Sequence, residues 1–135
     1  MKNSTKNNLY GIEVPLQIFS HDISVLYGDK QKAYDYIKSK DKEFVDETVL
    51  KNYVDGFSFK HWIYIGKKSN NYEVITHELV HAVNKCFDLR NIVWSDANGQ
   101  DEIFAYTLGF AVAYVLNTKN KQWYILKNNK WIKQK

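Results

Sequence analysis

The chain has one cysteine, one proline and one arginine among its 135 residues. Because Cys86 has no second cysteine to pair with, an intrachain disulfide and a zinc site built from cysteine ligands are both excluded. A single cysteine also fits a reducing compartment. The lone arginine, Arg90, stands against eighteen lysines. Proteins that read nucleic acids depend on the bidentate arginine fork, so the lysine excess favours a solubilising surface, and we expect no nucleic-acid partner.

Long hydrophobic runs are also missing. The longest apolar stretch covers residues 103–116, whereas a helix needs about 20 residues to span a bilayer. Residues 1–11 are polar and lack the apolar core of a signal peptide. We therefore expect a soluble, cytoplasmic protein with no membrane partner. These observations leave its oligomeric state open.

What the chain does contain favours a single folded domain over residues 1–135, with residues 1–8 as a loose polar tail. Apolar residues make up 44% and aromatic residues 16% of the sequence, which is enough for one packed core. Hydrophobic periodicity predicts strands at 10–20, 23–28 and 56–66, helices at 29–41, 72–87 and 100–116, and a hairpin or single strand after residue 122. We expect an α+β fold in which a small, mostly N-terminal mixed or antiparallel sheet packs on the last two helices.

The stretch VITHELVHAVNK, residues 74–85, carries the clearest chemical signal. His77 and His81 are four positions apart, so on a helix they share one face and can direct two imidazoles at one metal ion. Glu78 lies about 100° around the helix, where it can reach a water bound to that ion and act as general base in metal-assisted hydrolysis. The alternative is a helix that carries two surface or core histidines without a metal.

A catalytic metal site of this kind needs a third protein ligand. No histidine follows His81, so the downstream candidates are the acids Asp88, Asp96, Asp101 and Glu102. Glu102 is favoured because it would lie in the first turn of the next predicted helix, and a ligand is best placed on a rigid element. Its alternative role is to stabilise the helix N-terminus through the helix dipole.

HELVH, followed by 20 residues and then DEIFAY, resembles the gluzincin arrangement of thermolysin-like and related zinc metallopeptidases. The layout is also similar to small zincin-like metallopeptidases of phages and prophages. The resemblance implies a zincin-like fold, Zn²⁺ held by His77, His81 and Glu102, and a peptide or protein as the substrate. It further implies that the substrate lies in extended form along the strand at 56–66.

Three further residues each have two candidate roles. Asp101 either orients a metal-bound imidazole or caps its helix. Tyr106 stands where thermolysin-like enzymes have an aspartate, and it either donates a hydrogen bond to a developing oxyanion or packs in the core. His61 alternates with apolar residues of the predicted strand, so it is either a core histidine or a residue near the metal.

These expectations define two candidate functions. The first, which we favour, is a zinc-dependent peptidase that cleaves peptide bonds with Glu78 as general base. The second is a zinc-stabilised module that uses the same scaffold to bind a partner and turns over little or nothing. Two histidines and a glutamate favour zinc without excluding manganese, iron or cobalt.

Overall fold

The computed structural model describes residues 8–16, 23–66, 72–89, 100–118 and 123–133. In this part of the chain a six-stranded mixed sheet combines with three α-helices and a short 3₁₀ helix. The elements are β1 (Leu9–Val14), β2 (Ile23–Gly28), α1 (Lys30–Lys40), η2 (Glu47–Leu50), β3 (Gly56–Phe59), β4 (Trp62–Ile65), α2 (Tyr72–Leu89), α3 (Gln100–Thr118), β5 (Tyr124–Lys127) and β6 (Lys130–Lys133). Of the predicted tail, only Asn8 is described, and its carbonyl accepts a hydrogen bond from the Asp29 N–H.

The sheet brings strands from both halves of the sequence together. Its order is β3-β4-β2-β1-β5-β6, and every neighbouring pair is antiparallel except β2 and β4. β1 lies inside the sheet, where Tyr10 pairs with Ile125 and Gly11 with Tyr124. The predicted α+β class is confirmed. The sheet is mostly N-terminal, as predicted, because four of its six strands, β1 to β4, come from the first half of the chain, while β5 and β6 from the C-terminal end form one side of it.

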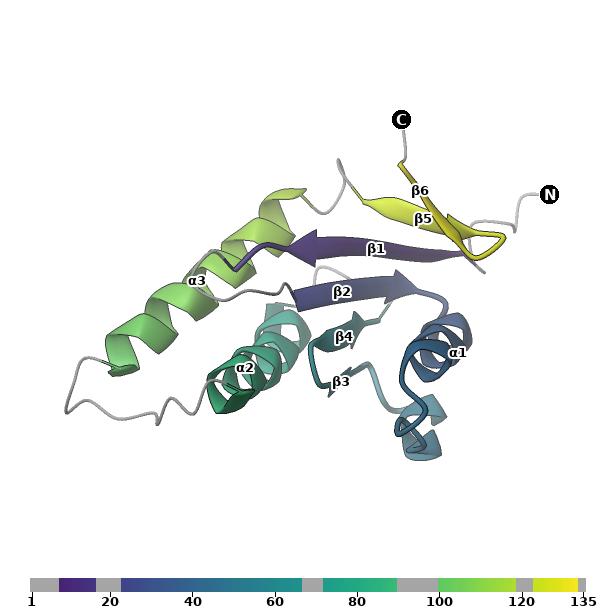
Figure 1. Cartoon of the computed structure of the whole chain (residues 1–135), viewed down its shortest axis with the longest axis horizontal. Coiled ribbons are helices and arrows are strands. Elements are labelled where there is room, and N and C mark those ends of the chain that lie inside the picture. Colours follow the sequence, from purple (N-terminus) through teal and green to yellow (C-terminus); the bar gives the residue numbers. More distant parts are fainter. Residues whose placement is uncertain (1–7, 17–22, 67–71, 90–99, 119–122, 134–135) are drawn as a thin grey trace.

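Helices cover both faces of the sheet (Figure 1). α2 and α3 pack on one face, and their apolar side chains form a core with Ile12, Val25 and Ile63 from three neighbouring strands. α1 packs on the opposite face, around Leu26 and Tyr64. Val25 and Leu26 are adjacent in β2 yet belong to different cores, because successive side chains of a strand point to opposite faces.

Three local features of the fold match simple signals in the sequence. Asp29 caps α1, and its Oδ1 accepts the backbone N–H of Lys32 at 2.9 Å. Asn128 and Asn129 link β5 to β6 with positive φ angles of 52° and 64°, a conformation that asparagine tolerates in two-residue hairpin turns. A helix forms at the longest apolar stretch, as α3. None of the described helices combines the length and the apolar character needed to cross a bilayer.

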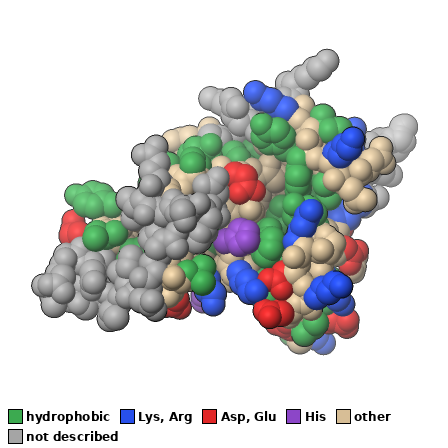
Figure 2. Space-filling view, in the orientation of Figure 1, with side chains coloured by type: hydrophobic (Ala, Val, Ile, Leu, Met, Phe, Trp, Pro, Cys, Tyr) green, Lys and Arg blue, Asp and Glu red, His purple; other side chains and the backbone are tan. Residues whose placement is uncertain are grey.

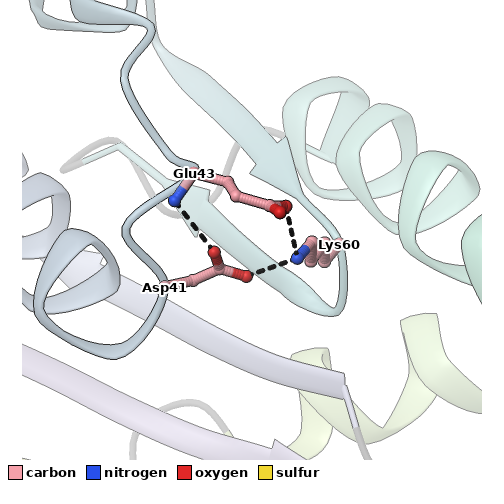
Figure 3. A network of polar contacts seen from close by, with 3 residues as sticks. All are labelled: Asp41, Glu43 and Lys60. Atoms are coloured by element: carbon pink, nitrogen blue, oxygen red, sulfur yellow. Dashed lines mark hydrogen bonds and ion pairs between the residues drawn. The ribbon is translucent and has the colours of Figure 1, made fainter.

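The predicted strand at residues 56–66 is wrong in one respect, because the chain reverses within it to form the β3–β4 hairpin. Lys60 adopts a φ of 53° in the turn, which is uncommon for a residue other than glycine. Its Nζ lies 2.5 Å from Asp41 Oδ2 and 3.0 Å from Glu43 Oε1 (Figure 3). These contacts tie the turn to the end of α1. Because the chain reverses here, β3 pairs with β4 and lies at one edge of the described sheet.

Gly56 begins β3 at the point where this edge strand touches α2. A Cβ at this position would lie 2.7 Å from Val74 Cγ1 and 3.0 Å from the Tyr64 carbonyl oxygen. A backbone carbonyl cannot turn aside as a flexible side chain can, so we expect Gly56→Ala to lower the free energy of unfolding by about 1–3 kcal/mol. Urea denaturation measures the change.

Gly109, in α3, provides the matched control. Apart from the neighbouring residues and backbone of its own helix, no described heavy atom lies within 4 Å of a Cβ at this position, and alanine is a better helix former than glycine. We therefore expect Gly109→Ala to raise the free energy of unfolding by about 0.5–1 kcal/mol. Equal effects of the two substitutions would contradict the close packing of β3 on α2.

Candidate metal centre

α2 has two faces of opposite character. Its apolar residues recur every three or four positions, and Ile75, Leu79 and Ala82 are buried in the core that α2 forms with the sheet. His77 and His81 are exposed. The predicted amphipathic helix is thus confirmed. Burial of one face fixes the direction in which the two imidazoles point.

The two imidazoles converge on one point. The Nε2 atoms of His77 and His81 are 3.2 Å apart, and the ring planes meet at 74°. Two nitrogens that each lie about 2.0–2.1 Å from a tetrahedral ion are about 3.3 Å apart. The observed spacing therefore suits two ligands of one ion. Together with Glu78, these side chains place ligand atoms within 4.8 Å of one another, and the three residues are called the metal cluster below.

Glu78 is buried between α2 and β3, unlike the two histidines beside it. The residue is 7% exposed, and a Cβ on Gly56 would lie 3.2 Å from its Cγ. Burial raises the pKa of Glu78 above its ordinary value, while the two imidazoles and a hydrogen bond from Ser58 act in the opposite direction. A carboxylate with a raised pKa beside a metal ligand suits proton transfer near neutral pH.

Removing the Ser58 hydroxyl is expected to raise the pKa of Glu78 further. The hydroxyl stabilises the ionised carboxylate, so in Ser58→Ala the effect of burial is less opposed. A carboxyl ¹³C NMR titration of the metal-free protein measures the pKa directly. Because the unfolded chain keeps the ordinary pKa of 4.5, the variant should also lose stability relative to wild type as the pH rises above that value. A lowered or unchanged pKa would contradict the contact between Ser58 and Glu78.

The predicted third ligand, Glu102, is not part of the metal cluster. It lies in the first turn of α3, and its side chain is exposed. Phe87 and Phe104 pack edge to face with ring centroids 5.3 Å apart, which holds the start of α3 against the second half of α2. Phe87 is six residues beyond His81, or about 9 Å along the helix axis. The role of Glu102 as a metal ligand stays a prediction.

The other candidate residues from the sequence lie in several places. Asp88 is exposed at the end of α2 and is outside the metal cluster. Asp96 and the side chain of Asp101 lie outside the described residues. Tyr106 is 75% exposed, so its predicted core packing is wrong, and its role toward an oxyanion stays a prediction. His61 lies in the β3–β4 turn, where it is only half-buried and lies outside the metal cluster, so the fully buried core role predicted for it is wrong.

Gly56 and Ser58 are two residues of the site that the sequence did not reveal. They occupy alternate positions of β3, on the side that faces α2. A glycine within a strand often marks a close approach of another segment. That signal was present in GFSF, but it did not name the segment that approaches, because the pairing of β3 with α2 is a tertiary contact.

Comparison with known proteins returns no match to this chain among protein-family models, curated proteins or solved structures. The resemblance to zincin-like metallopeptidases therefore rests on the HELVH motif and its spacing to Glu102. Conclusions about function have to be drawn from the geometry of the metal cluster.

Proposed function

We propose that the chain is a zinc-dependent peptidase of the zincin-like type, in which His77, His81 and Glu102 hold the metal and Glu78 is the general base. The observation that carries the proposal is the 3.2 Å approach of the two Nε2 atoms beside a buried glutamate. Two imidazole nitrogens and one carboxylate oxygen form a donor set that fits zinc. A catalytic zinc site keeps its fourth position for water or substrate.

The residues of the metal cluster divide the chemistry between them. Zinc, when bound, would polarise the scissile carbonyl and lower the pKa of a bound water to about 7. His77 and His81 are exposed, so a substrate can approach them from solvent. Glu78 accepts the proton of the attacking water and returns it to the leaving amine. Its raised pKa favours the protonated form that the second transfer requires.

The edge strand β3 supports a peptide as the substrate. Among the described strands it pairs only with β4, so its outer backbone groups face away from the sheet. An extended peptide can add to such an edge through main-chain hydrogen bonds. Because Ser58 of β3 contacts Glu78, a peptide on this edge lies close to the general base. Cys86 is buried and is the single cysteine of the sequence, so no intrachain disulfide forms, which agrees with the cytoplasmic setting that we propose for the reaction.

A second candidate function is a zinc-stabilised module that binds a partner protein without turnover. It is favoured by one observation, the position of Glu102 outside the metal cluster. A site with two histidine ligands and no third protein ligand lacks part of the usual catalytic set. Both candidates require zinc, and they differ in whether a peptide bond is broken.

Zinc titration and peptide cleavage together test the proposal. Metal-free protein is titrated with zinc in a calorimeter, and the loaded protein is incubated with a peptide library whose products are read by mass spectrometry. Zinc binding with cleavage that a chelator abolishes supports the peptidase. Zinc binding without cleavage supports the binding module. If the chain binds no zinc, both candidates fail.

A further inference from the structure

α3 is apolar on its outward side as well as on the side that packs in the core. Ala111 and Val115 are buried in the core that α3 forms with α2 and the sheet. On the other side of the helix, Ile103, Tyr106 and Phe110 are 42%, 75% and 44% exposed. In Figure 1 α3 lies at one end of the molecule, and Figure 2 shows hydrophobic side chains at the surface of that end. A helix that is apolar on all sides is normally buried on all sides, so the outward side is expected to meet a partner.

The exposed side chains are spaced as on a helix that packs along another helix. Four exposed residues follow one another at intervals of three, four and three positions: Ile103, Tyr106, Phe110 and Ala113. This alternation keeps side chains on the seam between two paired helices. The Phe110 ring is supported by Tyr114, with ring centroids 5.9 Å apart. The four exposed residues are called the outer seam below, and they extend over about 15 Å of the helix.

Charge limits the kind of partner that the outer seam can take. The sequence of α3 has two acids near its start, Asp101 and Glu102, and neither a lysine nor an arginine. A helix that lies on an anionic membrane carries basic side chains beside its apolar face, and binding to nucleic acid requires them as well. Residues 103–118 have no charged side chain. Because the chain has a net charge of +4, a second copy is repelled least along such a stretch.

The order of residues along the outer seam fits an antiparallel pair of helices. In such a pair Tyr106 of each copy lies opposite Phe110 of the other. Ile103 then lies opposite Ala113, so a bulky side chain meets a small one at each end. A parallel pair would bring the Glu102 carboxylates of both copies together, whereas an antiparallel pair keeps them at opposite ends. We propose that two copies of the chain associate through an antiparallel contact between their outer seams. The contact uses no residue of the metal cluster, so it does not depend on the proposed function.

The oligomeric state of the full chain tests the proposal. Stable protein interfaces bury about 800 Å² on each partner, and the outer seam is short, so we expect a weak dimer with a dissociation constant on the order of 10–100 µM. Sedimentation equilibrium at concentrations from about 5 to 500 µM brackets this value. A chelator is present throughout, which keeps bound metal from linking two copies. The average mass should rise with concentration from that of the monomer toward that of the dimer.

Substitutions of opposite charge test the pairing within the outer seam. Tyr106→Glu and Phe110→Lys should each weaken the dimer at least about tenfold, because each places a charge against an apolar ring. An equimolar mixture of the two variants should dimerise at least about fivefold more tightly than either alone, since one native pair is restored and the other becomes an ion pair. Tyr53→Glu is the control, because Tyr53 is 79% exposed and lies outside α3. Its dimer should be unchanged.

The result that overturns the proposal can take several forms. A monomer at every concentration would do so, and sedimentation of that monomer with phosphatidylcholine vesicles would assign the outer seam to a membrane surface instead. A dimer of unchanged affinity in both folded variants, or a mixture that associates no better than the single variants, would also overturn it. Amide spectra report whether each variant folds. If Phe110→Lys does not fold, Tyr106→Glu still decides, because Tyr106 is the more exposed of the two residues.

Discussion

Glu78→Gln is expected to lower the rate of peptide hydrolysis at least about 100-fold while zinc content stays the same. Glutamine keeps the shape of the side chain but cannot accept a proton, and the proposed metal ligands are His77, His81 and Glu102. Burial raises the pKa of Glu78, so replacing it with a neutral residue should not destabilise the metal-free protein at neutral pH. The measurements are kcat/KM, metal content by mass spectrometry and thermal denaturation.

The matched control for Glu78→Gln is Glu73→Gln, which changes an exposed acid in the first turn of the same helix. Its hydrolysis rate should stay close to that of wild type. Full activity in Glu78→Gln would exclude Glu78 as the general base. Loss of zinc in that variant would instead make Glu78 a metal ligand, a role its distance within the metal cluster allows.

Glu102→Ala is expected to weaken zinc binding by about two orders of magnitude or more, because it removes one of three proposed protein ligands. His77 and His81 alone would then hold the ion. A zinc titration against a competing chelator measures the affinity. Because Glu102 lies outside the metal cluster, this measurement decides whether the site has the third protein ligand that the peptidase requires.

Asp88→Asn is the matched control for Glu102→Ala. Asp88 is the other described acid that the sequence offered as a third ligand, and it is exposed at the end of α2. Its substitution should leave zinc affinity unchanged. The opposite pattern, a loss in Asp88→Asn alone, would move the third ligand to Asp88. Unchanged affinity in both variants would leave a site with two histidine ligands and favour the binding module.

The histidine pair was predictable because it depends only on local geometry. Residues four apart share one face of any α-helix, and the apolar spacing around HELVH predicted the helix itself. The 3.2 Å separation of the Nε2 atoms is within the reach of two histidines so placed. The N-cap at Asp29 and the turn at Asn128-Asn129 were predictable for the same reason, since each is set by neighbouring residues.

The surroundings of Glu78 were not predictable, because they depend on contacts between distant segments. The sequence of residues 56–66 alternates like one strand, and nothing in it signals the positive φ of Lys60 that turns it into a hairpin. Without that turn there is no edge strand to bring Ser58 to Glu78. The position of Glu102 relative to the two histidines could not be predicted from the sequence for a similar reason. A spacing along the chain does not fix how α2 and α3 pack, and here the Phe87–Phe104 contact does so.

The pairing of β1 with β5 has a consequence for synthesis on the ribosome. β1 is made early, yet one side of it finds its partner only when Tyr124 and Ile125 have emerged. Trp123, which is fully enclosed in the core formed by α2 and α3, arrives at the same late stage. Contacts between segments so far apart form slowly, and an unpaired strand edge can associate with other chains. A chain truncated before β5 should therefore depend on chaperones, because β1 then has no neighbour on the side that β5 occupies in the described fold.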